Sequence, residues 1–240
     1  MKKISLLSIF GLFLFASCEQ DFGITESEIT YLPLIELKGP AVVEINCGDS
    51  YSADAYSATA FEGGSEIQLN ETITGAYFGA STVSGPDYYE IAYSAVNKDG
   101  IPGSSFRQIY WKPCPGDLSA GDISGAYTST VVRNGSSSPQ YTDMGPVYIV
   151  KDGDSYKISD AIGGYYDFGR GYGWHYAGTG MMVTDNGNGT YSSGQTIGVG
   201  DFGGELVLDS FSVDPATGVI KFSTSWSFGY VFDVTLTPNN

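Results

Sequence analysis

The densest group of chemically capable side chains lies between residues 163 and 178, where aromatic rings alternate with glycines. So many glycines disfavour a regular strand, and the stretch is expected to form a long loop. Aromatic faces can stack on the C–H faces of sugar rings, while charged groups and an indole N–H bond the hydroxyls at the ring edge. The predicted ligand-binding residues are Tyr165, Tyr166, Asp167, Arg170, Tyr172, Trp174, His175 and Tyr176.

The same aromatic run has a second interpretation that the sequence leaves open. Large rings are also the side chains that fill the interior of a small β domain. Some of these rings would then plug one end of the domain, and the others would pack against a neighbouring domain. A ligand-binding lip and a structural plug are therefore both consistent with residues 163–178.

The remaining residues argue against catalysis. His175 is the only histidine, so a zinc site of the usual composition has no second imidazole. No Gly-x-Ser-x-Gly elbow presents a nucleophile, and most acidic residues sit in turns such as 185–189 rather than in a recognisable pair. We predict that the chain is not an enzyme and uses neither a metal nor a cofactor.

The amino-terminal stretch has the pattern of an export signal. Lys2 and Lys3 precede an apolar run from Ile4 to Phe15. A run of this length fits a secretory signal and is too short to span a membrane, which takes about 20 apolar residues. We therefore predict a signal peptide over residues 1–17.

Ala16 and Ser17 stand directly before Cys18 and resemble a bacterial lipobox. The resemblance implies cleavage before Cys18 and lipidation of that cysteine; the alternative is an ordinary secretion signal with a chance cysteine. The acidic residues at 19–21 resemble the surface-export signal of Bacteroidota lipoproteins. Residues 18–30 are then expected to be a flexible, lipid-anchored stalk on the cell outer membrane, displayed at the surface.

Composition restricts the partners and the fold class. Asp and Glu number 27 against 11 Lys and Arg, a net charge of −16, which repels nucleic acid and anionic membrane surfaces. Attachment to a membrane is therefore expected through lipid alone. With 33 glycines and 18 tyrosines, the chain has the composition of many short strands joined by tight turns, so we predict an all-β protein.

The pattern of strands and turns predicts two β regions. Short alternating segments fill residues 31–112, and residues 119–240 read as successive hairpins. Between them, Pro113 and Pro115 interrupt strand pairing, so 113–118 is the expected linker. We expect the second region to be an antiparallel meander, closed as a barrel or folded as a sandwich.

Three segments of the first region, residues 33–39, 43–51 and 89–100, resemble in order the bacterial Ig-like domain of surface proteins. That resemblance implies a β-sandwich in which the second short strand lies beside the last strand and runs parallel to it. Cys47 ends the former and Cys114 follows the latter, so the resemblance implies a disulfide; two free thiols are the alternative.

The carboxy-terminal region resembles β domains of Bacteroidota lipoproteins of unknown function that are encoded near glycan-uptake systems. Together with the aromatic run, this leads to our functional hypothesis: a non-catalytic envelope lipoprotein that binds carbohydrate. The first alternative is a structural or adhesion module that contacts another envelope or host protein. The second is a hydrolase, which would require two carboxylates facing each other in a pocket.

Overall fold

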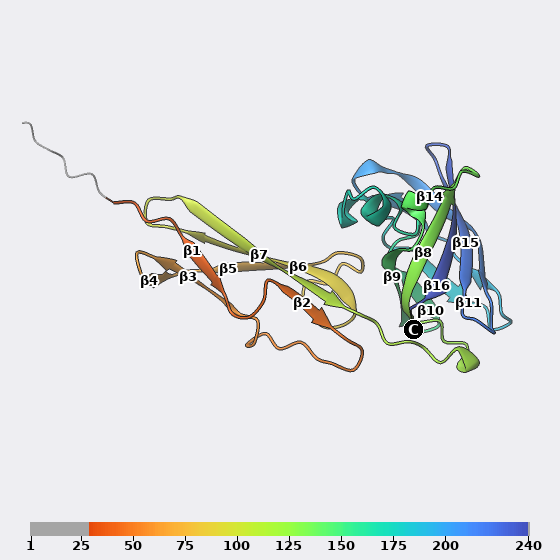
Figure 1. Ribbon diagram of the computed structural model, residues 1–240, viewed down its shortest axis with the longest axis horizontal. Coiled ribbons are helices and arrows are strands. Elements are labelled where there is room, and N and C mark those ends of the chain that lie inside the picture. The colour runs from red at the N-terminus through yellow and green to blue at the C-terminus, as the bar shows by residue number, and fades with distance from the viewer. Residues whose placement is uncertain (1–28, 240) are drawn as a thin grey trace, which may run out of the picture. The chain divides into compact units, whose positions relative to one another are not determined.

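The computed structural model describes residues 29–239, and its regular structure is almost entirely β-strand (Figure 1). The all-β class predicted from the sequence is confirmed. The predicted signal peptide (1–17), the predicted lipidation site Cys18 and nearly all of the predicted stalk (18–30) lie outside the described residues. Within residues 29–239, no helix is long and apolar enough to cross a lipid bilayer.

Two small sheets are formed by the first seven strands, with the orders β1-β3-β4 and β2-β7-β6-β5. The parallel pair β2 and β7 places Val42 opposite Gln108, in the arrangement that the Ig-like resemblance implies. The strands are β1 (Leu34–Leu37), β2 (Val42–Ile45), β3 (Ala58–Glu62), β4 (Ser65–Ile67), β5 (Asn70–Gly75), β6 (Asp87–Val96) and β7 (Pro102–Trp111).

The two sheets share one hydrophobic core. Alternation along β6 points Tyr89, Ile91 and Tyr93 inward, where they meet Ile109 of β7. Ile35 of β1, from the other sheet, packs against this group. Because side chains of both sheets meet in a single core, the first region is a two-layer sandwich.

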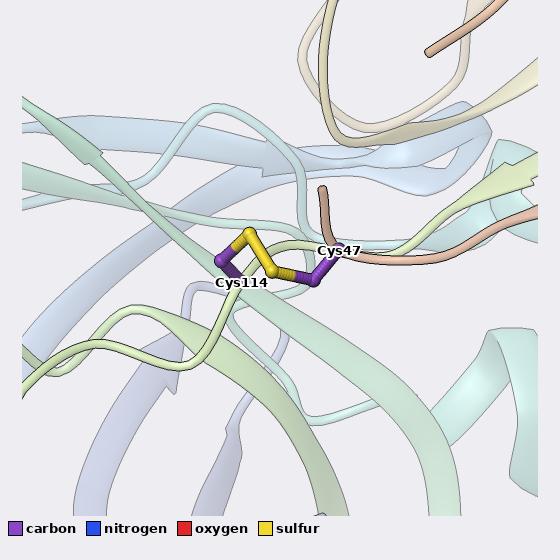
Figure 2. Close-up of a disulfide and its surroundings, with 2 residues drawn as sticks. All are labelled: Cys47 and Cys114. Atoms are coloured by element: carbon purple, nitrogen blue, oxygen red, sulfur yellow. A yellow bond between two sulfur atoms is a disulfide. The ribbon is translucent and has the colours of Figure 1, made fainter. Parts of the chain in front are cut away.

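A disulfide joins Cys47, just after β2, to Cys114, just after β7 (Figure 2). The sulfur atoms are 1.98 Å apart and the Cα atoms 4.7 Å apart. This is the pair that the Ig-like resemblance singled out. Parallel pairing of Ile45 with Trp111 brings the two strand ends to the same place, so the bridge follows directly from the register.

Replacing Cys47 and Cys114 together by serine is expected to lower the free energy of unfolding by about 4 kcal/mol, because the bridge closes a loop of 67 residues in the unfolded chain. Urea denaturation measures the loss. Reductant should destabilise the wild type to the same extent and leave the double variant unchanged. A fully reduced wild type with unaltered stability would contradict this expectation.

The carboxy-terminal region is one antiparallel sheet of nine strands, in the order β12-β11-β10-β9-β8-β16-β15-β14-β13. β12 and β13 are its two free ends, so the sheet curls without closing by hydrogen bonds (Figure 1). The strands are β8 (Gly125–Arg133), β9 (Met144–Asp152), β10 (Ser155–Ile158), β11 (Met182–Asp185), β12 (Tyr191–Ser192), β13 (Thr196–Val199), β14 (Gly203–Val213), β15 (Ile220–Trp226) and β16 (Tyr230–Pro238).

Short helical turns connect these strands. The long connection between β10 and β11 contains a π-helical turn and one 3-10 turn, and it is the segment in which the sequence places the ligand-binding residues. The turns are η1 (Leu118–Ala120), η2 (Pro139–Tyr141), η3 (Tyr165–Gly169), η4 (Trp174–Tyr176) and η5 (Gly200–Phe202).

The connection between β10 and β11 folds back onto the sheet. Asp160 accepts hydrogen bonds from the backbone N–H groups of Ile162, Gly164 and Gly178, and so holds both ends of the connection together. Gly163 has a φ of +63°, and a Cβ there would collide with side chains of β8 and β16. Glycine at this position therefore permits the close approach that places η3 inside the domain.

Residues Leu32–Asn240 form one compact unit, and a small buried cluster joins the two β regions. Among the described strands, none of β1 to β7 pairs with any of β8 to β16. The predicted boundaries at 31–112, 113–118 and 119–240 stay predictions. The cluster consists of Ala76, Tyr77, Tyr88, Tyr148 and Ala177.

Candidate functional site

The structure divides the eight predicted ligand-binding residues into groups with different surroundings. Tyr165, Tyr166 and Asp167 are buried, with exposed fractions of 2%, 8% and 8%. Arg170, Tyr172 and His175 are exposed, while Trp174 and Tyr176 are half-buried. The eight residues therefore do not form one continuous lip.

Tyr165 and Tyr166 belong to the hydrophobic core of the curled sheet. The ring of Tyr165 stacks on Tyr141 at 4.1 Å between centroids and meets the edge of Phe232 at 5.3 Å. A ring enclosed in this way cannot stack on a sugar. The expectation that Tyr165 contacts a ligand is corrected by its burial, and the plug that the sequence left open describes this ring.

Asp167 is committed to a contact between the two β regions. Its Oδ2 atom accepts a hydrogen bond of 2.7 Å from the hydroxyl of Tyr77. Burial raises the pKa of the Asp167 carboxyl, and the hydrogen bond from Tyr77 opposes that rise. The predicted role of Asp167 in bonding sugar hydroxyls does not fit this buried position.

Trp174 and His175 form a pair of rings on η4. The indole of Trp174 stacks on the imidazole of His175 at 3.8 Å between centroids. Trp174 also packs against the cluster that contains Tyr77 and Tyr148. Its predicted place in the lip stays a prediction, and in the structure the half-buried indole packs where the two β regions meet.

Exposed aromatic rings do gather elsewhere in the same domain, in a group that we call the aromatic surface. Three of them are strongly exposed, with fractions of 50% for Tyr172, 39% for Phe202 and 58% for Phe228. They come from the connection before β11, from η5 and from the turn and strand that follow β15. The aromatic surface consists of Tyr172, Tyr176, Phe202, Phe228 and Tyr230.

The rings of the aromatic surface are linked by direct contacts. Tyr176 lies 5.5 Å from Tyr172 and 4.7 Å from Phe202, measured between ring centroids. The buried indole of Trp226 lies beneath and joins Phe202 at 6.1 Å to Phe228 at 4.6 Å. Its N–H donates to the carbonyl of Gly203, so this ring is held in place.

Glycines bring these segments together. Gly200 has a φ of +42°, and a Cβ there would collide with the backbone of His175 and Tyr176. Only glycine therefore lets η5 approach η4 closely enough for Phe202 to reach Tyr176.

Phe202 and Phe228 were not predicted from the sequence. Each stands next to a glycine in a turn, or close to one, much as Tyr172 stands between Gly171 and Gly173. A large aromatic residue beside glycine in a turn is a sequence signal that would have identified Tyr172, Phe202 and Phe228. A residue in a turn has few neighbours that could bury its side chain.

Arg133 and Arg170 lie beside the aromatic surface. The guanidinium of Arg133 is 4.6 Å from the ring centroid of Tyr230 and 4.9 Å from that of Tyr165. The guanidinium of Arg170 is 5.9 Å from the Tyr165 centroid, and its hydrogen bond with the Tyr165 hydroxyl raises the pKa of Arg170. Both side chains are therefore positive and positioned by rings.

Three buried carboxylates have structural partners. Asp87 accepts hydrogen bonds from the backbone N–H groups of Tyr77, Phe78 and Tyr88. The partners of Asp160 and Asp167 are described above. Among residues 29–239, no group of three or more His, Cys, Asp or Glu side chains is arranged to hold a metal ion.

Fold and surface together describe an all-β protein with two β regions and an exposed aromatic surface on the second. Residues 115–238 match the family model described as "-like, C-terminal domain". The match covers more than half of the chain, so the chain belongs to this family.

A solved structure shares the fold of most of the chain. It is the crystal structure of a lipoprotein from Bacteroides thetaiotaomicron, with a TM-score of 0.52 and 23% sequence identity. The similarity covers 86% of this chain and 100% of that one. No curated protein shows significant sequence similarity to the chain.

Proposed function

We propose that the protein is a non-catalytic lipoprotein of the cell envelope that binds carbohydrate through the aromatic surface. The observation that carries this proposal is the exposure of Tyr172, Phe202 and Phe228 in one contiguous group. Solvent-exposed rings of this size cost free energy unless a partner covers them.

Carbohydrate suits this surface for a physical reason. A pyranose ring has faces of C–H groups that stack on aromatic faces, while its hydroxyls stay in contact with water or polar groups. The hydroxyls of Tyr172 and Tyr230 and the guanidinium of Arg170 stand at the edge of the rings as hydrogen-bonding groups. The alternative is that a partner protein covers the aromatic surface with an apolar patch of its own. The experiment below distinguishes carbohydrate binding from this alternative.

The placement in the envelope rests on separate observations. Ala16 and Ser17 before Cys18 have the pattern of a lipidation signal, and the related solved structure is itself described as a lipoprotein. A net charge of −16 disfavours adsorption to anionic lipid, so an acyl anchor at Cys18 would supply the attachment. We propose anchoring in the outer membrane with surface display.

A glycan array probed with the chain from residue 19 onward tests the proposal. Tyr172→Ala and Phe228→Ala are each expected to weaken binding about fivefold, since one stacking ring contributes roughly 1 kcal/mol. Phe106→Ala is the matched control, because Phe106 lies on β7 of the other region and is 58% exposed, the same fraction as Phe228.

Cells that express the full chain test the envelope placement with the same glycan. They should bind a fluorescent form of it at their surface, and Cys18→Ala should remove that signal. The carbohydrate proposal fails if no glycan on the array is bound, or if Phe228→Ala and Phe106→Ala behave alike.

A further inference from the structure

The chain contains three arginines, and two of them lie at the aromatic surface. Arg107 is the third: it is fully buried, and its guanidinium donates to the carbonyls of Lys38 and Pro40. Arg107 therefore has a structural role. Arg133 and Arg170 remain, at the end of β8 and directly after η3.

Both of these guanidinium groups lie over one ring. Arg133 is 4.9 Å and Arg170 is 5.9 Å from the centroid of Tyr165. The two guanidinium carbons can therefore be no more than about 11 Å apart, the sum of these distances. Arg133 also contacts Tyr230, so the positive charge adjoins the aromatic surface directly.

Neither arginine has a carboxylate partner among residues 29–239. The ion pairs within the described residues join Lys112 to Glu44, Lys151 to Asp122 and Lys157 to Asp152. Arg133 and Arg170 contact tyrosine hydroxyls and ring faces instead. Within residues 29–239, no ion pair neutralises the charges of Arg133 and Arg170, and both guanidinium groups lie over the same ring.

We propose that the ligand of the aromatic surface is an anionic carbohydrate, whose sulfate ester or uronate carboxylate is bound by Arg133 and Arg170. This inference rests on the proposed function and names the class of sugar. A guanidinium binds an oxyanion through two parallel N–H donors, which a neutral sugar hydroxyl cannot match. The neighbouring rings of Tyr172 and Tyr230 contact the sugar ring itself.

The acidic body of the protein does not prevent such binding. At physiological ionic strength, charges in solvent are screened beyond about 8 Å, so distant carboxylates contribute little at the arginines. The local positive charge then decides the attraction. The remaining negative charge keeps other anions, such as nucleic acid and anionic lipid, from adsorbing elsewhere on the surface.

The experiment compares binding of four polysaccharides to the chain from residue 19 onward by biolayer interferometry. Chondroitin sulfate carries both anionic groups, its desulfated form only the uronate, its carboxyl-reduced form only the sulfate, and dextran neither. We expect binding of chondroitin sulfate and of one singly charged form, with dextran unbound. Binding should weaken as salt is added.

Arg170→Gln is expected to reduce binding of the anionic sugar about tenfold, because it removes one charge-assisted contact. Lys221→Gln removes the same charge from an exposed position on β15 and should leave binding unchanged. Arg133→Lys keeps the charge and loses the planar fork, so it should weaken binding as well. Arg170 is exposed, and a thermal melt checks that each variant is folded.

The outcomes distinguish this inference from the proposal on which it rests. If the protein binds neutral glycans on the array equally well and Arg170→Gln has no effect, the anionic class is wrong while carbohydrate binding stands. If neither neutral nor anionic glycans bind, both statements are wrong. Equal effects of Arg170→Gln and Lys221→Gln would also overturn the inference, since only net charge would then matter.

Discussion

Raising the pH from about 4 to about 7.5 is expected to lower the free energy of unfolding by about 4 kcal/mol. The groups responsible are Asp87 and Asp160, whose carboxyls are almost completely shielded from solvent. Burial raises the pKa of Asp87 from 3.8 to about 6 and that of Asp160 from 3.8 to about 7, although three backbone N–H donors at each carboxyl oppose the rise.

The sign of the effect follows from proton binding. Both folded-state pKa values exceed the value of 3.8 in the unfolded chain, so between these limits the folded state binds more protons. The stabilisation is then complete below pH 4 and is lost as the pH rises through about 6 and 7. A difference of one pKa unit between the folded and unfolded chain corresponds to about 1.4 kcal/mol of unfolding free energy. Water that reaches the ionised carboxylates makes the summed loss smaller than these pKa differences alone would give.

Urea denaturation at a series of pH values measures the fall. Asp160→Asn should flatten the curve, because an amide carries no charge, and should lower stability at acidic pH by leaving one backbone donor without an acceptor. Asp214→Asn is the control: Asp214 is exposed, and hydrogen bonds from the backbone of Ala216 and from Thr217 lower its pKa, so it titrates below this window. Stability that rises between pH 4 and 7.5 would contradict the assignment.

Local patterns were sufficient to predict the all-β class. The Asn-Lys-Asp-Gly sequence at 97–100 connects β6 to β7, and Asp152 to Asp154 connect β9 to β10. In both cases the turn residues and the alternation of the flanking strands lie within a few positions of each other. Such short-range signals determine hairpins before any distant contact forms.

The candidate site could not be predicted in the same way. The run from 163 to 178 has the composition of an exposed loop, yet its first half is buried by contacts with residues far along the chain, such as Phe232. Asp160 holds that fold, and nothing in its sequence neighbourhood distinguishes it from a turn acid. The burial of Arg107 likewise depends on carbonyls of Lys38 and Pro40, 69 and 67 positions earlier, which no local pattern indicates.

The first half of the run from 163 to 178 is mostly buried and the second half is more exposed, so substitutions in the two halves should differ in their effect on stability. Tyr165→Ala is expected to lower the free energy of unfolding by about 4 kcal/mol, since truncating a buried aromatic side chain leaves a cavity and removes its packing. The ring is 2% exposed and contacts Tyr141, Tyr166 and Phe232. Tyr172→Ala should change stability by less than about 1 kcal/mol, because half of that side chain is in solvent.

Chemical denaturation of the two variants, with glycan binding measured in parallel, separates a packing ring from a ligand-contacting ring. Tyr165→Phe serves as the matched control: it keeps the ring and removes only the hydroxyl that bonds Arg170, so most of the stability should be retained. A stable Tyr165→Ala protein that has lost glycan binding would mean that Tyr165 acts in binding, either by contact with the ligand or by positioning Arg133 and Arg170. An unstable one that binds normally when folded would show that the ring holds η3 in the curled sheet, while the neighbouring exposed rings meet the sugar.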